Sequence, residues 1–307
     1  MKRASIYIIV LCALLCGCKG NSLSEDIEPN ETETIQSNYS EEEKYSESKT
    51  EEAADSMEES ESDEKYIETD EEYIERLNSI YSEIKEDISV LGNKKTEILF
   101  NEIPWKSNFT QSEEKMKKND GYKNGAIFKG VIHSPYYFLC GNGKKNYEGS
   151  DYSEIGGITR TVFDEMKIAG YNVSDCAMCF VGIEKNGVYI LSDEDSILYA
   201  ACYTIESTNV KTTKEDLKIK ISSIYGDPDK TMEIEPYANA PITEEFIYWY
   251  GANDTVLVLS SDEGGRITLS YVWLGGEELL KNALDSVENA QSESEEGIYG
   301  DGNTNGL

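Results

Sequence analysis

The sequence predicts an α+β fold, with a mostly antiparallel sheet and helices on one side. Short apolar segments follow one another between residues 126 and 273, and Asn186-Gly187 between two of them is a strong signal for a two-residue hairpin. Helical patterns precede groups of strands, which is typical of α+β domains. Two such blocks, each a helix followed by strands, start near Ile103 and Thr212 and indicate a divergent duplication.

The N-terminus has the pattern of a secretory signal peptide. Lys2 and Arg3 precede an apolar run from Ile6 to Leu15. This run is about half of the ~20 residues needed to cross a bilayer, and it fits the hydrophobic region of a signal peptide. Of the cysteines nearby, only Cys18 follows a small residue, Gly17.

The segment Leu15-Cys16-Gly17-Cys18 resembles the lipobox of bacterial lipoproteins. The resemblance, to a lipoprotein of Gram-positive type, implies cleavage after Gly17 and a diacylglyceryl group, with palmitate as a typical acyl chain, on Cys18. Two acyl chains hold a protein on a membrane, whereas one gives reversible attachment. The protein is therefore expected on the extracytoplasmic face of the cell membrane. The alternative is an ordinary signal peptide with a coincidental cysteine.

Acidic residues dominate the chain, with 60 Asp and Glu against 28 Lys and Arg and a formal net charge of -32. The charge is -19 over residues 21–75 and -11 over residues 76–285. Residues 18–66 contain few large apolar groups, so they predict a disordered acidic tether. The alternatives for this segment are weak cation binding and contact with a basic partner. The acid excess argues against nucleic-acid binding.

Residues 67–95 predict an amphipathic helix. Thr69 and Glu72 form a capping-box pattern, and Gly92-Asn93 ends the helix. We expect the helix to pack on its own domain, and the alternative is weak self-association through residues 69–91 as a short coiled coil. Both interpretations depend on one apolar stripe, which consists of Ile74, Leu77, Tyr81, Ile84, Ile88 and Leu91.

Residues 96–285 predict the globular domain, and residues 286–307 a disordered tail. The first block of the globular domain has a short strand or lead-in at Ile98–Ile103 and a helix at Ser107–Lys118. The predicted strands of this block are Ala126–Leu139, Ile158–Ile168, Cys176–Ile183, Val188–Leu191 and Ser196–Ile205. The second block has a helix from Thr212 or Thr213 to Tyr225, strands Phe246–Tyr250, Thr255–Leu259 and Ile267–Trp273, and a short closing helix at Glu277–Leu284.

The second block carries a further resemblance. Leu217, Tyr225-Gly226-Asp227-Pro228, Tyr248-Trp249 and Leu257 look like a unit found in lipoproteins of Gram-positive bacteria. That unit is similar to the tandem repeats of the beta-lactamase inhibitor protein fold, and the likeness covers about 70 residues. It implies a duplicated α+β body. The first block has no Tyr-Gly-x-Pro stop.

The cysteines of the body are predicted to be core residues. On a strand, Cys176 and Cys179 would lie ~10 Å apart on opposite faces, beyond the reach of a disulfide. A cross-strand bridge from Cys202 or Cys140 remains open outside the cell.

No catalytic or metal-binding set is predicted, and no cofactor. His133 is the one histidine, which excludes a multi-histidine metal site. Ser82-x-x-Lys85 and Ser112-x-x-Lys115 lack the companion motifs of beta-lactamases. Asp301-Gly302-Asn303-Thr304-Asn305-Gly306 starts like a calcium loop but lacks its glutamate.

Tyrosine-bearing loops are the candidate binding residues, because aromatic residues dominate interface hot spots. Most of these tyrosines are alternatively expected to pack on the sheet. The six candidates are Tyr136, Tyr137, Lys144, Lys145 and Tyr147 around the Gly-rich loop 140–157, and Tyr237 in the loop 229–244.

Taken together, these patterns predict a membrane-anchored extracytoplasmic lipoprotein whose α+β domain binds a protein or envelope ligand without catalysis. One alternative is an envelope hydrolase that uses paired carboxylates. The other is a structural component of an envelope assembly.

Overall fold

The structure of the protein, a computed structural model, describes most of the chain between residues 69 and 299. The predicted signal peptide, lipobox and acidic tether lie outside the described residues. The described ranges are 69–92, 95–119, 122, 125–133, 135–141, 147–161, 166–235, 244–262 and 264–299.

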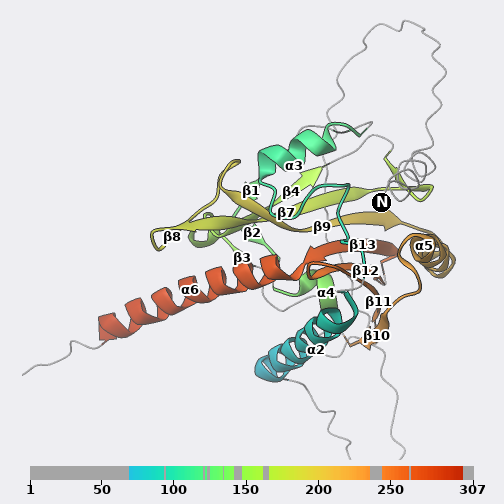
Figure 1. The fold of residues 1–307 in the computed structure, drawn as a ribbon. Helices are drawn as coiled ribbons and strands as arrows, with labels where there is room; N and C mark the ends of the chain where they lie inside the picture. The colour runs from blue at the N-terminus through green and yellow to red at the C-terminus, as the bar shows by residue number, and fades with distance from the viewer. Residues whose placement is uncertain are drawn as a thin grey trace, which may run out of the picture. The chain divides into compact units, whose positions relative to one another are not determined.

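A large antiparallel sheet forms the centre of the fold (Figure 1). This confirms the predicted α+β class with a mostly antiparallel sheet. The strand order is β1 (Phe128–Lys129), β4 (Gly156–Thr161), β7 (Asp175–Lys185), β9 (Ser196–Glu206), β13 (Arg266–Trp273), β12 (Thr255–Ser261), β11 (Glu244–Gly251) and β10 (Lys230–Ile234), and β8 (Val188–Ile190) pairs with β7. Two small ribbons are formed by β2 (Val131–Ile132) with β3 (Tyr147–Glu148) and by β5 (Lys167–Ile168) with β6 (Tyr171–Asn172).

The sheet consists of two meanders that meet at its middle. One runs β1-β4-β7-β9 and the other β10-β11-β12-β13, so the last strand of each meander pairs with the last strand of the other. Ser270 lies opposite Cys202 in this central antiparallel pair. A helix precedes each meander, namely α3 (Phe109–Met116) and α5 (Val210–Tyr225). This topology is the one that a duplicated unit with a two-fold axis at β9–β13 would have.

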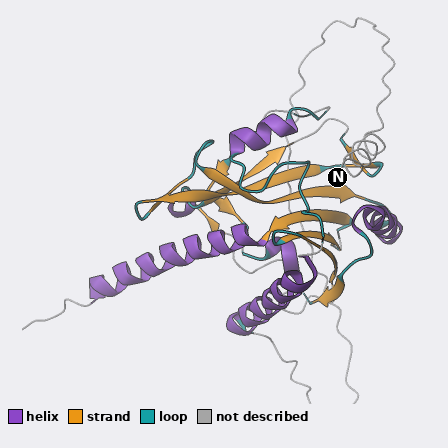
Figure 2. Ribbon diagram, viewed as in Figure 1, coloured by secondary structure: helices purple, strands orange, loops and turns teal. Residues whose placement is uncertain are grey.

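Helices cover both faces of the sheet, in place of the single helical side expected from the sequence (Figure 2). On β12, Leu257 and Leu259 face α5, whereas Val256 and Val258 face the opposite layer. Because adjacent strand residues point to opposite faces, both faces need a cover. The opposite layer contains α2 (Asp70–Leu91), α4 (Tyr137–Cys140) and α6 (Leu274–Tyr299).

Helix α2 begins with the predicted capping box, in which Glu72 N–H donates to Thr69 Oγ1 and Thr69 N–H donates to Glu72 Oε2. Its stripe packs into the core beneath it, so the prediction that the helix packs on its own domain is confirmed. The buried members are Leu77, Tyr81, Ile84 and Ile88, joined by Tyr73, while Ile74 and Leu91 are exposed.

Helix α6 is longer than predicted. It runs from Leu274 to Tyr299, so it begins before Glu277 and includes residues 286–299 of the segment expected to be a disordered tail. Gly276 allows its first turn to lie against the sheet, because a Cβ there would fall 2.2 Å from Cβ of Tyr199. Tyr199 is the extra residue of a bulge in the pairing of β7 with β9, and it lies on the α6 side.

The predicted Asn186-Gly187 turn joins β7 to β8. Both residues have positive φ, 56° and 80°, as a type I′ turn requires, and Lys185 pairs with Val188 across it.

Other predicted segments need correction. Ala126–Leu139 is not one strand. It contains β1, β2 and the start of α4, with Tyr136 in the left-handed region at φ 73°. Ile158–Ile168 contains the end of β4 and β5, and Ile98–Ile103 contains one isolated bridge, between Phe100 and Ile103. The loop predicted at 229–244 contains β10.

Three of the residues that carry the resemblance of the second block lie in one hydrophobic cluster. Leu217, Trp249 and Leu257 pack together between α5 and the sheet. The indole N–H of Trp249 donates to the carbonyl of Gly226 at 3.0 Å, which fixes the end of α5 to β11. Helix α5 starts at Val210 with Asn209 as its cap, earlier than the predicted Thr212 or Thr213.

Candidate functional site

The structure describes three of the predicted binding residues, Tyr136, Tyr137 and Tyr147, and they do not line either of the two hollows considered below. Lys144, Lys145, Tyr237 and the lipidation residue Cys18 lie outside the described residues.

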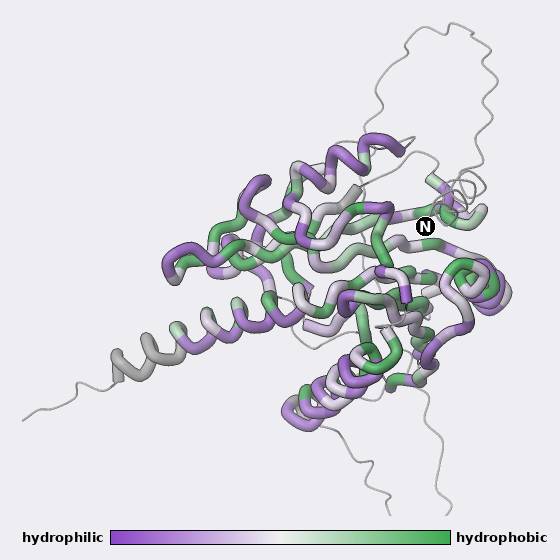
Figure 3. The backbone as a smooth tube through the Cα atoms, in the orientation of Figure 1, coloured by the Kyte–Doolittle hydropathy of each residue, from purple (hydrophilic) through white to green (hydrophobic). Residues whose placement is uncertain are grey.

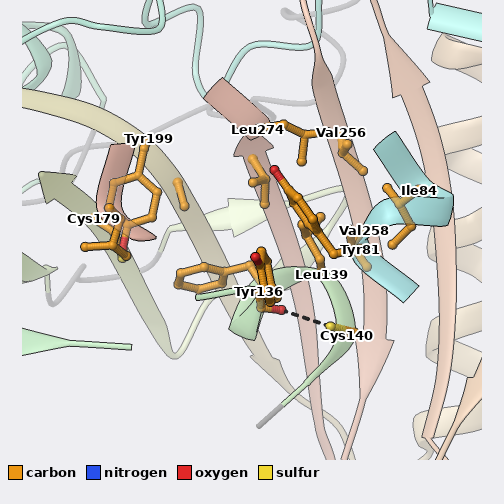
Figure 4. Packing of buried hydrophobic residues seen from close by; sticks show 14 of the residues in the cluster. Tyr81, Ile84, Tyr136, Leu139, Cys140, Cys179, Tyr199, Val256, Val258 and Leu274 are labelled. Atoms are coloured by element: carbon orange, nitrogen blue, oxygen red, sulfur yellow. Dashed lines mark hydrogen bonds between the residues drawn. The ribbon is translucent and has the colours of Figure 1, made fainter. Parts of the chain in front are cut away.

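Tyr136 is a core residue that is only 8% exposed. Its ring centroid lies 4.2 Å from that of Tyr81, and its carbonyl accepts a bond from Cys140 Sγ at 3.4 Å (Figure 4). Burial raises the pKa of the Tyr136 hydroxyl to about 12. Its ring therefore belongs to the packed layer under α2 and α6.

Tyr137 and Tyr147 are half-buried at the margin of the same core. The Tyr137 ring stacks on His133 with centroids 4.2 Å apart, and the Tyr147 ring meets Tyr152 edge-on at 5.3 Å. Burial raises the pKa of Tyr137. These side chains fit the alternative in which tyrosines pack on the sheet.

Glu277 is a buried carboxyl group that sequence reasoning missed. It is 1% exposed in the first turn of α6, and its Oε2 accepts a hydrogen bond from the Tyr136 N–H at 3.2 Å. Burial raises its pKa to about 7. A general acid must reach a substrate, but Glu277 lies inside the core and lines neither hollow described here.

Three of the body cysteines, Cys140, Cys176 and Cys179, are free thiols in the core, and Cys202 is partly exposed. Cys176 packs on the α3 side of the sheet and Cys179 on the α2 and α6 side, which confirms that they point to opposite faces. Burial raises the pKa of Cys140, Cys176 and Cys179, so the reactive thiolate is disfavoured.

An open groove lies beside α3. It has a volume of about 470 Å³. Two short segments form it, the turn 104–107 and residues 111–118, which include most of α3 and the turn after it. The lining residues are Pro104, Trp105, Lys106, Ser107, Gln111, Glu114, Lys115 and Lys118.

Local sequence explains how α3 presents this side. Asn108 caps the helix by accepting from Gln111 N–H at 2.9 Å, and Phe109 N–H donates to Ser196 Oγ on β9 at 2.9 Å. Phe109 and Met116 are buried beneath the helix, whereas Gln111 and Glu114 are exposed. The backbone of α3 carries mostly hydrophilic residues (Figure 3). Gln111, Glu114 and Lys115 share one side of α3, because residues three and four apart are neighbours on a helix. Lys118 lies in the turn just after the helix and also lines the groove.

Lys106 contributes to the lining from the turn 104–107. Its backbone is in the left-handed region, with φ at 71°, and its ammonium group lies 4.7 Å from the centre of the Trp273 ring. An ammonium group over an indole face is held by a cation–π interaction. The sequence offered no signal for this residue, because the fold alone brings Lys106 to Trp273.

The groove lysines differ from most lysines of the domain. Among the lysine side chains that the structure describes, Lys106, Lys115, Lys118, Lys167, Lys211 and Lys218 form no ion pair. The lysines that form ion pairs with Asp or Glu are 85, 95, 117, 129, 185, 214, 220, 230 and 281. Half of the unpaired group therefore lines one groove, which Glu114 only partly neutralises.

A second hollow of about 460 Å³ is lined by Lys95, Thr96, Ile224, Tyr225 and Tyr250. Lys95 is already paired there, with its Nζ 2.6 Å from Oδ1 of Asp229. The positive charge of the lysine in this hollow is therefore already neutralised by an aspartate.

Comparisons with protein-family models, with curated proteins and with solved structures found no match to this chain. Within the part of the chain that the structure describes, no helix is long and apolar enough to span a membrane. In the same residues, no group of three or more His, Cys, Asp and Glu side chains is placed to hold a metal ion.

Proposed function

We propose that this protein is a membrane-anchored extracytoplasmic lipoprotein whose α+β domain binds an anionic ligand in the α3 groove. The observation that carries the binding function is the set of unpaired lysines, Lys106, Lys115 and Lys118, around one hollow of an acidic chain. The lipobox pattern before Cys18 supports the anchor.

The groove chemistry supports binding over catalysis. It holds ammonium groups, one carboxylate and one amide, and its hydroxyl group, on Ser107, donates to the Pro104 carbonyl at 2.6 Å. Nucleophilic catalysis needs a base within reach of the nucleophile. An envelope hydrolase would use two carboxylates across a cleft, but Glu114 is the one carboxylate in this lining.

The anchor is tested by growing the native bacterium with labelled palmitate. We expect label on the full chain and none on Cys18→Ser, with Cys16→Ser as the matched control that keeps its label. Protease added to intact cells should remove the domain from labelled protein, because it faces the exterior. An unlabelled wild-type chain would contradict the anchor.

The binding function is tested on the full chain purified in detergent. Titration with inorganic pyrophosphate should change tryptophan fluorescence, because Trp105 lines the groove and Trp273 lies under Lys106. The change should disappear in Lys106→Gln/Lys115→Gln/Lys118→Gln. An unchanged response in that variant would exclude the groove as the anion site.

A further inference from the structure

Building on the proposed binding function, we propose that the natural ligand of the α3 groove carries phosphate groups together with hydroxyl groups, as in a chain of polyol or sugar units joined through phosphate. The proposal names the ligand chemistry of this groove and commits to a soluble chain.

The groove favours a ligand with more than one negative charge. Lys106 and Lys118 are exposed and Lys115 is half-buried. None of the three is neutralised by an acid within the described residues, although the chain offers 60 acidic side chains. A volume of about 470 Å³ falls in the range of small-ligand sites, roughly 300–1,000 Å³. A hollow of this size has room for one short stretch of a polymer.

The type of cation favours phosphate over carboxylate. All the cationic groups of the lining are lysines. The planar fork of arginine matches a carboxylate in two parallel bonds, whereas lysine acts as a point charge and is a regular binder of phosphate.

The remaining polar groups suit hydroxyls between phosphates. The Gln111 side-chain oxygen accepts from Asn108 N–H at 3.2 Å, so its NH₂ group is the part left to donate. Glu114 is exposed and can accept from a hydroxyl, but it repels an uninterrupted polyanion. Trp105 adds an apolar wall, since its indole N–H is already bonded to the Ile98 carbonyl at 2.8 Å. This combination fits a ligand in which anionic and hydroxyl groups alternate.

The test uses the full chain purified in detergent and a short glycerol phosphate oligomer as the probe. Binding is measured by calorimetry and by tryptophan fluorescence at low and physiological salt. We expect binding that weakens as salt rises, because exposed charges are screened within about 8 Å at physiological ionic strength. Glu114→Gln should bind pyrophosphate more tightly by a few-fold, and gain less for the oligomer.

The chain offers a control with an equal change of charge. Lys106→Gln/Lys115→Gln/Lys118→Gln should lose roughly tenfold or more in affinity for the oligomer, a change of about 1.4 kcal/mol or greater. Lys167→Gln/Lys211→Gln/Lys218→Gln removes three lysines that are also unpaired but lie on β5 and α5, and it should stay within about twofold of wild type. Thermal unfolding of both variants checks that they fold.

The following results would overturn all or part of the proposal. Equal losses in the two triple variants would overturn it, because the effect would then be general charge. A short oligoglutamate peptide that binds as tightly as the oligomer would overturn the phosphate chemistry and leave the proposed anion-binding function intact. Binding to phosphatidylglycerol vesicles without binding to the soluble oligomer would assign the groove to a membrane surface and overturn the soluble ligand. Loss of palmitate label would remove the anchor alone.

Discussion

The backbone N–H of Tyr136 donates a hydrogen bond to Oε2 of Glu277 over 3.2 Å in the protein interior. The bond joins the residue before α4 to the first turn of α6. Tyr136 has a φ of 73°, a conformation that non-glycine residues rarely adopt and that costs of the order of 1 kcal/mol or more. Glu277 therefore supports a strained backbone position, and its own charge is disfavoured by burial.

This pair predicts a pH dependence of stability. Burial raises the pKa of Glu277 to about 7 from an ordinary value of 4.5, so its contribution is fully present below pH 4.5 and is lost as pH rises through about 7. The free energy of unfolding of wild type relative to Glu277→Gln should fall by roughly 3 kcal/mol between pH 4.5 and 8.5. Urea unfolding at the two pH values measures this difference.

Glu278→Gln is the matched control, because Glu278 is the exposed neighbour that pairs with Lys85. Its stability relative to wild type should change little over the same pH range. A Glu277→Gln difference that does not vary with pH would show that Glu277 ionises normally in the folded protein.

Gly276 is predicted to tolerate no side chain. A Cβ at this position would lie 2.2 Å from Cβ of Tyr199, and neither the sheet nor α6 can move without disturbing the core. Gly276→Ala should lower the free energy of unfolding by about 2–4 kcal/mol. Gly187→Ala, in open space at φ 80°, should lose only about 1 kcal/mol. Equal losses, measured by denaturant unfolding, would contradict the close approach of α6.

The thiols should differ in reactivity. Cys140, Cys176 and Cys179 are buried with raised pKa values, whereas Cys202 is partly exposed. In the folded full chain we expect iodoacetamide to label Cys202 first and the other three only after unfolding. Peptide mass spectrometry assigns each site, and a disulfide-linked Cys176–Cys179 peptide from native protein would disprove their opposite orientation.

Lys230 ties α2 to the edge strand β10. Its Nζ lies 2.6 Å from Glu83 Oε1 and 2.6 Å from Asp87 Oδ2. Lys230→Met should lower the free energy of unfolding by about 1 kcal/mol, with a smaller loss at high salt, because the carboxylate partners of this lysine are exposed enough for salt to screen the pairs. Lys218→Met, on α5 and without an ion pair, should be near neutral. A loss that is independent of salt would point to packing instead.

Local signals were enough where neighbouring residues decide the structure. The capping box of Thr69 and Glu72 and the turn at Asn186-Gly187 depend on residues at most three apart, and both form as predicted. Strand β10 also had a signal, because apolar Met232 and Ile234 alternate with polar residues in the segment taken for a loop.

Helix α4, the second helical layer and the groove depend on contacts between residues that are distant in the sequence. A short apolar run such as the one ending at Leu139 has no periodicity that separates strand from helix, and α4 depends on contacts of Tyr136 with Glu277. The second helical layer follows from strands that are apolar on both faces, as at Leu257 and Val258. The groove depends on a turn that places Lys106 over Trp273, which no sequence spacing indicates.

The central place of β13 has a consequence for synthesis. It is the last strand that the structure describes, yet it lies between β9 and β12, so both halves of the sheet keep an unpaired inner edge until Trp273 has been made. Open edges and unburied apolar surface make such intermediates prone to aggregation. The sheet can therefore close only after Trp273 has been synthesised, and chaperones that bind unfolded chains would meet the two open halves before then.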